Sequence, residues 1–260
     1  MVYGTTRSPE KGERLSSLGI QPVLLDITRP LDPGSLPETD RVLYCVGIDR
    51  KEGDSIRAVH LDGLSRVLDA LRVRGPIARL VHVSSTSVYG ESQGEWVTEE
   101  TPPNPKTEAG RACLEAEQCV SRSRFDASIL RYSGLYGPGR IIGKGALEKR
   151  EAISGDPEGW LNLIEIDDAA EAAIAVLDQG KAARTYLATD DRPVRRREYY
   201  ERVARWLNVD PPRFSTAVVA RSDRSDKRVS NRRIQDELGF RLQSAEIEAG
   251  LRRVFSNEMS

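Results

Sequence analysis

The amino-acid sequence predicts an α/β protein built on a doubly wound parallel sheet. Short apolar runs rich in β-branched residues alternate along the chain with longer segments that carry helical spacing, which is the pattern of β-α-β units. One of these runs, residues 80–83, breaks at once into the hydroxyl residues 84–87. A buried strand that ends in polar groups is typical of the ligand-binding edge of a parallel sheet. The alternative interpretation is ordinary loop chemistry, in which Ser and Thr bond their own turn.

Composition and charge narrow the class of protein. The 260 residues are 38% hydrophobic and 30% charged, which describes a folded globular chain with a substantial core. Lys and Arg total 39 against 40 Asp and Glu, so bulk charge gives no case for binding nucleic acid or a membrane surface. Three Cys and two His are too few for a disulfide framework or a metal centre, and we expect no metal. No apolar run reaches the ~18 residues of a membrane span and no signal pattern follows Met1, so the cytoplasm is the expected compartment.

The first elements form a short strand-helix-strand unit. Residues 2–7 read as the end of a strand followed by a turn. Ser8 and Pro9 start a helix, because Ser caps helices and Pro suits the first helical position, and Gly19 ends it. An apolar run then predicts a strand at residues 20–27.

The middle of the chain continues the alternation. After a loop rich in Pro and Gly, residues 41–46 form a second buried strand. Residues 56–73 place apolar side chains at helical spacing before a Gly-Pro pair ends the helix. The strand at 80–83 follows. The polar loop at 91–105 is too long for a simple connection, which makes it a candidate loop beside a substrate.

The second half of the chain adds further helices and strands. Helices are expected at residues 106–120, 169–177, 195–207 and 244–255, and strands at residues 127–132, 161–166 and 185–188. Asp167 and Asp168 are expected to cap the helix at 169–177, because carboxylates stabilise the positive end of a helix. Residues 221–233 carry six Lys or Arg against two Asp. Such a segment either receives an anionic substrate or, more commonly, is a solvated face.

Four motifs, in this order, resemble the extended and atypical short-chain dehydrogenase/reductases, the family that includes nucleotide-sugar epimerases and dehydratases. The motifs are SSTSVYG at 84–90, RYSGLYGPGR at 131–140, NLIEIDDAAEA at 162–172 and SNRRIQDELGF at 230–240. Together they cover nearly the whole chain, and their order makes the resemblance specific where any one motif would not. The last motif and the helix at 106–120 look most similar to an atypical subgroup described as nucleoside-diphosphate-sugar epimerases.

The resemblance implies a Rossmann-like NAD(P)-binding fold with a small substrate lobe. We expect the dinucleotide-binding core at residues 1–160, with residues 161–190 returning to it, and the substrate-side lobe at residues 191–260. The implied partner is a small molecule, with a nucleotide sugar as the candidate, and neither nucleic acid nor membrane. A homodimer is left open.

The family pattern also implies site residues. Ser85 stands where the family hydrogen-bonds the reacting oxygen of its substrate, a role that suits a hydroxyl at a strand end. Further substrate-facing positions fall on Thr86, Tyr89, Tyr136 and Arg140. Cofactor positions fall on Ser84, on Val46 and Gly47 at the end of a strand, and on Asp26 near the adenine. For Asp26 the equally good alternative is a carboxylate that bonds its own turn.

One expected part of a Rossmann fold is missing from the sequence. A glycine-rich turn should let the backbone approach the dinucleotide pyrophosphate, and none stands in the first half of the chain. Residues 2–7 resemble the end of the family's second strand, so the sequence is expected to start about one β-α unit late, on the order of 25 residues. The strands on either side of the missing one would then lack a shared neighbour. A late start assignment or an N-terminal fragment is the preferred explanation, and a shortened protein that has lost cofactor binding is the alternative.

The end of that first strand favours NADP over NAD as the cofactor. NAD-preferring folds place Asp or Glu there to bond the ribose 2′-hydroxyl, whereas Arg accommodates a 2′-phosphate. Here Thr5, Thr6 and Arg7 come before the first acid, Glu10. Hydroxyls and a guanidinium suit a phosphate. The alternative is a surface turn with an incidental Arg.

The catalytic pair of the family is also missing. The family places a Tyr four residues before a Lys, on the helix that follows the long loop, and the Lys makes the phenol usable near neutral pH. Aligned on that pattern, Thr107 stands at the Tyr position and Arg111 at the Lys position. No tyrosine occurs between Gly90 and Tyr132, so no shift of register restores the phenol. Arg111 could still hold a ribose or a phosphate, but Thr107 cannot act as a phenolic acid.

Other residues near the predicted site could transfer a proton instead. Tyr89 and Tyr136 lie at strand ends, although Tyr89 is commonly a packing residue in this motif. Glu115 and Glu117 are expected to be solvated positions of the helix. The leading hypothesis is an NAD(P)-binding oxidoreductase or epimerase of the short-chain dehydrogenase/reductase type, acting on a nucleotide-sugar-like molecule. The competing hypothesis is a non-catalytic dinucleotide-binding sensor or scaffold that has lost the Tyr/Lys pair.

Overall fold

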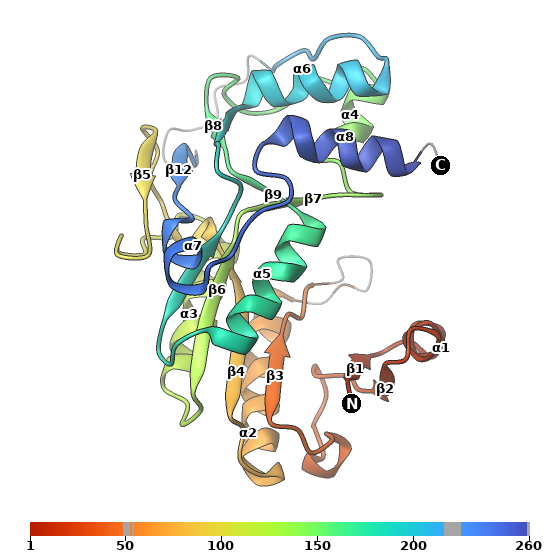
Figure 1. Cartoon of the computed structure of the whole chain (residues 1–260), viewed down its shortest axis with the longest axis vertical. Coiled ribbons are helices and arrows are strands. Elements are labelled where there is room, and N and C mark those ends of the chain that lie inside the picture. The colour runs from red at the N-terminus through yellow and green to blue at the C-terminus, as the bar shows by residue number, and fades with distance from the viewer. Residues whose placement is uncertain (49–52, 54, 216–224, 259–260) are drawn as a thin grey trace.

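A parallel four-stranded sheet forms the centre of the computed structural model (Figure 1). The structure describes residues 1–260 except 49–52, 54, 216–224 and 259–260. The sheet has the strand order β10-β6-β4-β3, and all of its neighbouring strands are parallel. Its strands are β3 (Arg41–Tyr44), β4 (Arg79–Ser85), β6 (Ala127–Tyr132) and β10 (Thr185–Ala188). The predicted α/β class with a parallel Rossmann-like sheet is therefore confirmed.

Helices cover both faces of this sheet. Leu80 packs into a cluster with α2 (Leu64–Arg74) and α3 (Glu108–Ser121), while its neighbour Val81 packs into a second cluster with α5 (Ile166–Gln179). Successive strand residues point to opposite faces, so the two clusters lie on the two sides of β4. Both faces of the strand are buried here, which explains why the successive residues Leu80 and Val81 are both apolar.

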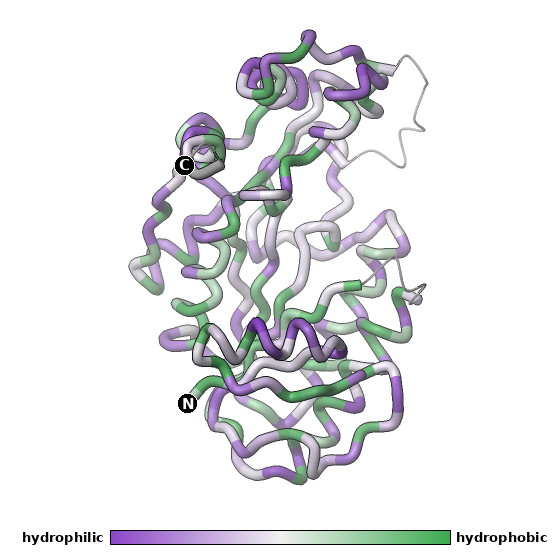
Figure 2. The backbone as a smooth tube through the Cα atoms, turned by 90° about the vertical axis from the view of Figure 1, so that its right-hand side faces the viewer, coloured by the Kyte–Doolittle hydropathy of each residue, from purple (hydrophilic) through white to green (hydrophobic). Residues whose placement is uncertain are grey.

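The N-terminal unit forms a ladder of its own. Strands β1 (Tyr3–Thr6) and β2 (Gln21–Leu24) pair in parallel, and α1 (Pro9–Ser17) connects them along the chain. Ser8 caps α1 and accepts a hydrogen bond from the Lys11 N–H. The mostly hydrophilic α1 lies on the outer side of the molecule, facing the viewer in Figure 2.

The sheet is interrupted between β1 and β3. Among the described residues, no ladder joins the β1-β2 pair to the four-stranded sheet. Apolar side chains on these two strands are exposed, with Tyr3 of β1 41% and Leu43 of β3 39% accessible. The interruption falls where the sequence predicted that two strands would lack a shared neighbour.

A second group of elements stands beyond the carboxyl ends of the sheet strands. A separate apolar cluster holds together α4 (Lys144–Glu148), β11 (Val194–Arg195), α6 (Arg196–Leu207) and α8 (Ile247–Glu258). Figure 1 shows α4, α6 and α8 together at the top of the molecule. The cluster takes residues from before position 191 as well as after it.

Short strands connect this upper group to the sheet. They are β5 (Glu95–Val97), β7 (Gly134–Tyr136), β8 (Trp160–Leu161), β9 (Leu163–Glu165) and β12 (Lys227–Val229), and α7 (Arg232–Leu238) follows β12. β5 pairs in parallel with β12, which places the loop at 91–105 beside a segment more than a hundred residues further along the chain. The part of the predicted basic segment at 221–224 lies outside the described residues.

Two predicted helix features differ in the structure. The helix expected at 56–73 contains a π-helical stretch, Ala58–Gly63, before α2 begins. The predicted caps of α5 are wrong, because Glu165 is the N-cap and accepts from the Asp167 N–H at 2.9 Å. Asp168 instead accepts from the backbone N–H groups of Gln243 and Ser244, which ties the C-terminal segment to α5.

Within the described residues, none of the helices combines the length and apolarity needed to cross a bilayer. The same part of the chain contains no group of three or more His, Cys, Asp or Glu side chains placed to hold a metal ion.

Candidate functional site

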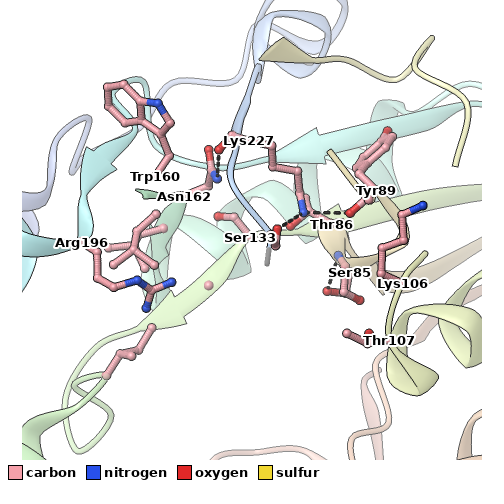
Figure 3. Close-up of a pocket in the computed structure, with 17 residues that line it drawn as sticks. Ser85, Thr86, Tyr89, Lys106, Thr107, Ser133, Trp160, Asn162, Arg196 and Lys227 are labelled. Carbon is pink, nitrogen blue, oxygen red and sulfur yellow. Dashed lines mark hydrogen bonds between the residues drawn. The ribbon is translucent and has the colours of Figure 1, made fainter. Parts of the chain in front are cut away.

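A pocket of about 320 Å³ opens at the carboxyl ends of β4 and β6 (Figure 3). Its floor comes from residues that follow these two strands, and its roof comes from β8, β12 and the start of α6. Hydroxyl groups and cations dominate the polar part of the lining: Ser85, Thr86, Ser87, Lys106, Thr107, Ser133, Arg196, Ser225 and Lys227. No Asp or Glu belongs to the described lining, so the pocket favours a neutral or anionic ligand.

Ser85 lies at the floor of this pocket. It ends β4, and its Oγ accepts a hydrogen bond from the Ser87 N–H at 3.1 Å. That contact uses a lone pair of the hydroxyl and leaves its proton available to donate. Thr86 and Tyr89 also line the pocket. With Thr107, the pocket therefore gathers four of the residues that sequence reasoning assigned to the catalytic and substrate sides.

A buried ion pair lies beneath this floor. Arg131 of β6 donates from Nη2 to Glu117 Oε2 at 2.6 Å and from Nε to Glu117 Oε1 at 2.9 Å. Ser84 donates to the same carboxylate at 2.5 Å, and Arg131 Nη1 donates to the Tyr89 hydroxyl at 2.6 Å. The expectation that Glu117 is solvated is wrong, because its side chain is only 6% exposed. These contacts join α3, β6 and the end of β4.

Neither predicted tyrosine is placed to transfer a proton to a ligand in this pocket. Burial raises the pKa of Tyr89 to about 12, against the opposing effect of the nearby Arg131, and the Tyr89 hydroxyl donates to the Thr98 carbonyl at 2.9 Å. The Tyr136 side chain is fully buried and lies against Gly250 of α8, outside the pocket lining. Burial raises its pKa as well.

Thr107 and Arg111, which the family resemblance predicted at the positions of the catalytic pair, make local contacts in the structure. Thr107 is the N-cap of α3, and its Oγ1 accepts from the Gly110 N–H at 3.0 Å. Its side chain also borders the pocket. Arg111 is exposed, donates to the Lys106 carbonyl at 3.1 Å and does not line the pocket.

Two other predicted residues also lie outside the pocket. Ser84 is buried against Glu117, as described above, and borders neither cavity of this edge. Arg140 donates from Nε to the Leu135 carbonyl at 3.2 Å and is exposed.

Sequence reasoning missed the roof of the pocket. Trp160 and Asn162 come from β8 and the residues after it, Arg196 from α6, and Lys227 from β12. Asn162 holds β12 in place, because its amide donates to the Lys227 carbonyl at 2.9 Å and accepts from the Val229 N–H at 2.7 Å. The one signal in the sequence was the basic segment at 221–233, which contains Lys227.

A second cavity, of about 250 Å³, lies between the ends of β1 and β3. It gathers five of the predicted cofactor residues: Thr5, Arg7, Asp26, Val46 and Gly47. The Asp26 carboxylate accepts from the N–H and hydroxyl of Thr28 at 2.9 and 2.6 Å, and its second oxygen pairs with Arg29 at 3.2 Å. The Thr28 hydrogen bond lowers the Asp26 pKa. Asp26 therefore bonds its own turn, the alternative that the sequence left open.

This second cavity fits one end of a dinucleotide. Two Thr hydroxyls and the Arg7 guanidinium can hold a ribose or its phosphate, and a Cβ on Gly47 would meet nothing within 4 Å. No glycine-rich turn from strand to helix borders the cavity in the part of the chain that the structure describes. The residues present fit the adenosine end of such a cofactor, and the described backbone offers no cradle for its pyrophosphate.

Comparison with known proteins extends these observations. Residues 40–188 match the NAD dependent epimerase/dehydratase family. The protein YeeZ of Escherichia coli K12 is 31% identical over 247 residues, which cover 92% of this chain and 85% of YeeZ.

Solved structures show the same fold. A conserved protein of unknown function from Silicibacter pomeroyi superposes with a TM-score of 0.75 at 26% identity, covering 99% of this chain and 90% of that one. MoeE5 in complex with UDP-glucose and NAD superposes with a TM-score of 0.78 at 18% identity, covering 100% of this chain and 99% of that one.

Proposed function

Since this chain belongs to the NAD dependent epimerase/dehydratase family, we propose that it binds NADP or NAD and acts as an oxidoreductase or epimerase on a nucleotide sugar. The observation that carries the proposal is the pocket at the end of β4, where Ser85 meets a roof of cations and no carboxylate. Hydroxyls suit the oxygens of a sugar, and cations suit a diphosphate.

The substrate would lie with its sugar toward Ser85 and its diphosphate toward the cations. Lys106 and Arg196 border the pocket on different sides. Trp160 adds an aromatic surface, and the guanidinium carbon of Arg195 lies over its ring, 3.7 Å from the centroid. The structural neighbour MoeE5 is described with UDP-glucose, which makes UDP-glucose a reasonable first probe.

The cofactor would enter from the second cavity. Thr5, Thr6 and Arg7 would hold its ribose end, and the guanidinium favours the 2′-phosphate of NADP. When bound, the nicotinamide would accept or donate a hydride. The residues of this chain would orient the sugar, donate a hydrogen bond from Ser85 to its reacting oxygen, and shield that oxygen from water.

A second candidate function is dinucleotide-dependent sensing without catalysis. Two contacts support it, since Thr107 caps α3 and Arg111 donates to the Lys106 carbonyl without lining the pocket. The two functions differ in turnover and share the binding of dinucleotide.

Intrinsic fluorescence offers a direct test, because Trp160 lines the pocket. We expect UDP-glucose to change the fluorescence of the wild-type protein, and the Trp160→Phe variant to lose that change. Conversion of UDP-glucose in the presence of NADP or NAD is then followed by NMR of its anomeric protons. Binding of UDP-glucose and dinucleotide without conversion favours the sensor, and a protein that binds neither contradicts both functions.

A further inference from the structure

The roof of the pocket holds a buried lysine, Lys227. It belongs to β12, which pairs with β5 so that Lys227 lies opposite Glu95. The residue is only 4% exposed, yet it lines the pocket. Figure 3 shows its side chain reaching from β12 toward the side of the pocket that Ser85 and Thr86 form.

The ammonium group of Lys227 has neutral partners. Its Nζ donates to the Tyr89 carbonyl at 3.0 Å and to the Ser225 hydroxyl at 2.6 Å. Within the described residues, no carboxylate oxygen lies close enough to Nζ, at 4.0 Å or less, to form an ion pair with it. Buried lysines are rare unless they are paired, so this amine sits in a site that disfavours its charged form.

The surrounding charges do not return the pKa of Lys227 to the usual value for a lysine. Burial lowers the pKa of Lys227 to about 8, and the more distant Glu91 only partly offsets it. Lys106 and Arg196 border the same pocket from α3's side and from α6, and the Asp226 carboxylate is bound to the Trp160 N–H at 2.8 Å. At pH 7 roughly a tenth of such an amine is neutral, against far less than a hundredth for an exposed lysine.

A purely structural role does not require a lysine here. A backbone carbonyl and a hydroxyl can be bridged by any neutral donor, and burying a charge for that purpose is unfavourable. The third position on Nζ is not used by a described protein group. Because Lys227 lines the pocket, we expect its Nζ to reach a ligand there.

We propose that Lys227 is the acid–base group of this pocket and exchanges a proton with a hydroxyl of a polyhydroxylated ligand. The neutral Nζ takes the hydroxyl proton, so that an N–H bond forms as the O–H bond breaks, and the ammonium later returns the proton to the oxygen. The role of acid–base group is open in this chain, because the family pattern places Thr107 where the family has its tyrosine. The inference rests on the proposed function for the identity of the ligand.

Competitive labelling tests the amine itself. The chain has only seven lysines, so trace acetic anhydride followed by mass spectrometry can report the reactivity of each one as a function of pH. We expect Lys227 to titrate near pH 8 and saturating UDP-glucose to slow its labelling at least fivefold. Lys149 is exposed and lies outside the pocket lining, so UDP-glucose should leave its labelling rate unchanged. A Lys227 that titrates near pH 10 overturns the proposal.

A conservative variant separates proton transfer from structure. Lys227→Arg keeps a cation and two donors but cannot lose its proton near neutral pH. We expect it to bind UDP-glucose within about threefold of the wild type, measured by calorimetry, and to lose at least 100-fold in conversion, whereas Lys149→Arg changes neither. Retained conversion in Lys227→Arg overturns the proposal.

The result also distinguishes this inference from the proposed function. UDP-glucose that binds the wild type without slowing Lys227 labelling contradicts the role of Lys227 and leaves the substrate class standing. A wild type that neither binds nor converts UDP-glucose contradicts the proposed function, and the role of Lys227 falls with it.

Discussion

Glu117 of α3 and Arg131 of β6 form a two-point ion pair directly beneath the candidate site, with Nη2–Oε2 and Nε–Oε1 distances of 2.6 and 2.9 Å. Both side chains are only 6% exposed. The pair also binds Ser84 and the Tyr89 hydroxyl. Its members therefore hold the end of β4, from which Ser85 reaches the pocket.

Removing one partner of this pair should be strongly destabilising. Glu117→Gln leaves the Arg131 guanidinium buried without a counter-charge, which we expect to lower the free energy of unfolding by about 3–5 kcal/mol. Urea denaturation measures the change. Glu115→Gln is the matched control on the same helix, since Glu115 is 54% exposed and reaches Arg57 only at 3.8 Å. We expect it to change stability by less than about 0.5 kcal/mol, and equal effects in the two variants would contradict the assigned role of the pair.

Adjacent serines should have different effects when each is replaced by alanine. Ser85→Ala removes the hydroxyl that faces the pocket and should lower conversion about 10²-fold while the fold is kept. Ser84→Ala removes a hydrogen bond to Glu117 and should lower stability by about 1 kcal/mol while UDP-glucose still binds. Conversion assays and urea denaturation of both variants test this division. It is wrong if Ser84→Ala has the larger effect on conversion.

Thr107 should behave as a helix cap. Thr107→Ala removes the acceptor for the Gly110 N–H and should lower the free energy of unfolding by about 1 kcal/mol. Thr107→Ser keeps the hydroxyl and should retain both stability and conversion. A serine variant that is stable but inactive would instead assign the residue a chemical role that its methyl group supports.

The central strands could be predicted from sequence because each is a short apolar run with few alternatives. The strand at 127–132 has the predicted bounds in the structure, and so does the strand at 185–188. The interruption of the sheet beside β3 could also be predicted, because the sequence lacks the glycine-rich turn that follows the first strand of such a fold. By contrast, β5 and β12 pair across more than a hundred residues, and no local pattern in either strand encodes that contact.

The site was only half predictable for the same reason. Ser85 could be predicted as a site residue because it closely follows an apolar run in the sequence, which is a local pattern. Lys227 reaches the pocket through β12, whose place depends on two hydrogen bonds with Asn162. Glu117 was predicted to be solvated because charged residues of a helix usually face water. It lies on the buried face of α3, where its ion pair with Arg131 of β6 stabilises the carboxylate.

Stability below pH 4.5 should depend on Glu237 of α7. Its carboxylate accepts from Arg184 Nη2 at 2.5 Å and lies 3.3 Å from Lys181 Nζ. The Arg184 hydrogen bond lowers the pKa of Glu237 from 4.5 to about 2. Because the folded pKa is the lower one, the stabilisation is complete above about pH 4.5 and is lost as the pH falls toward 2.

The Glu237→Gln variant tests this pH window. Its urea midpoint should lie below that of the wild type at pH 7, and the difference should shrink between pH 4.5 and 2. Glu13→Gln, at an exposed position of α1, should follow the wild type throughout. A difference that stays constant down to pH 2 would show that the ion pairs of Glu237 contribute no titratable stability.

Cofactor preference should depend on Arg7. The guanidinium borders the second cavity beside Thr5 and Thr6, and it is close enough to Asp26 to help lower that carboxyl's pKa. A 2′-phosphate at this position would gain a charge-assisted hydrogen bond that a 2′-hydroxyl would not. We therefore expect Arg7→Ala to weaken NADPH binding about tenfold or more and NADH binding by less than about threefold, measured by nucleotide fluorescence. Arg14→Ala, on an exposed turn of α1, is the control that should affect neither. Equal weakening of both dinucleotides would mean that Arg7 supports the cavity wall and does not select the phosphate.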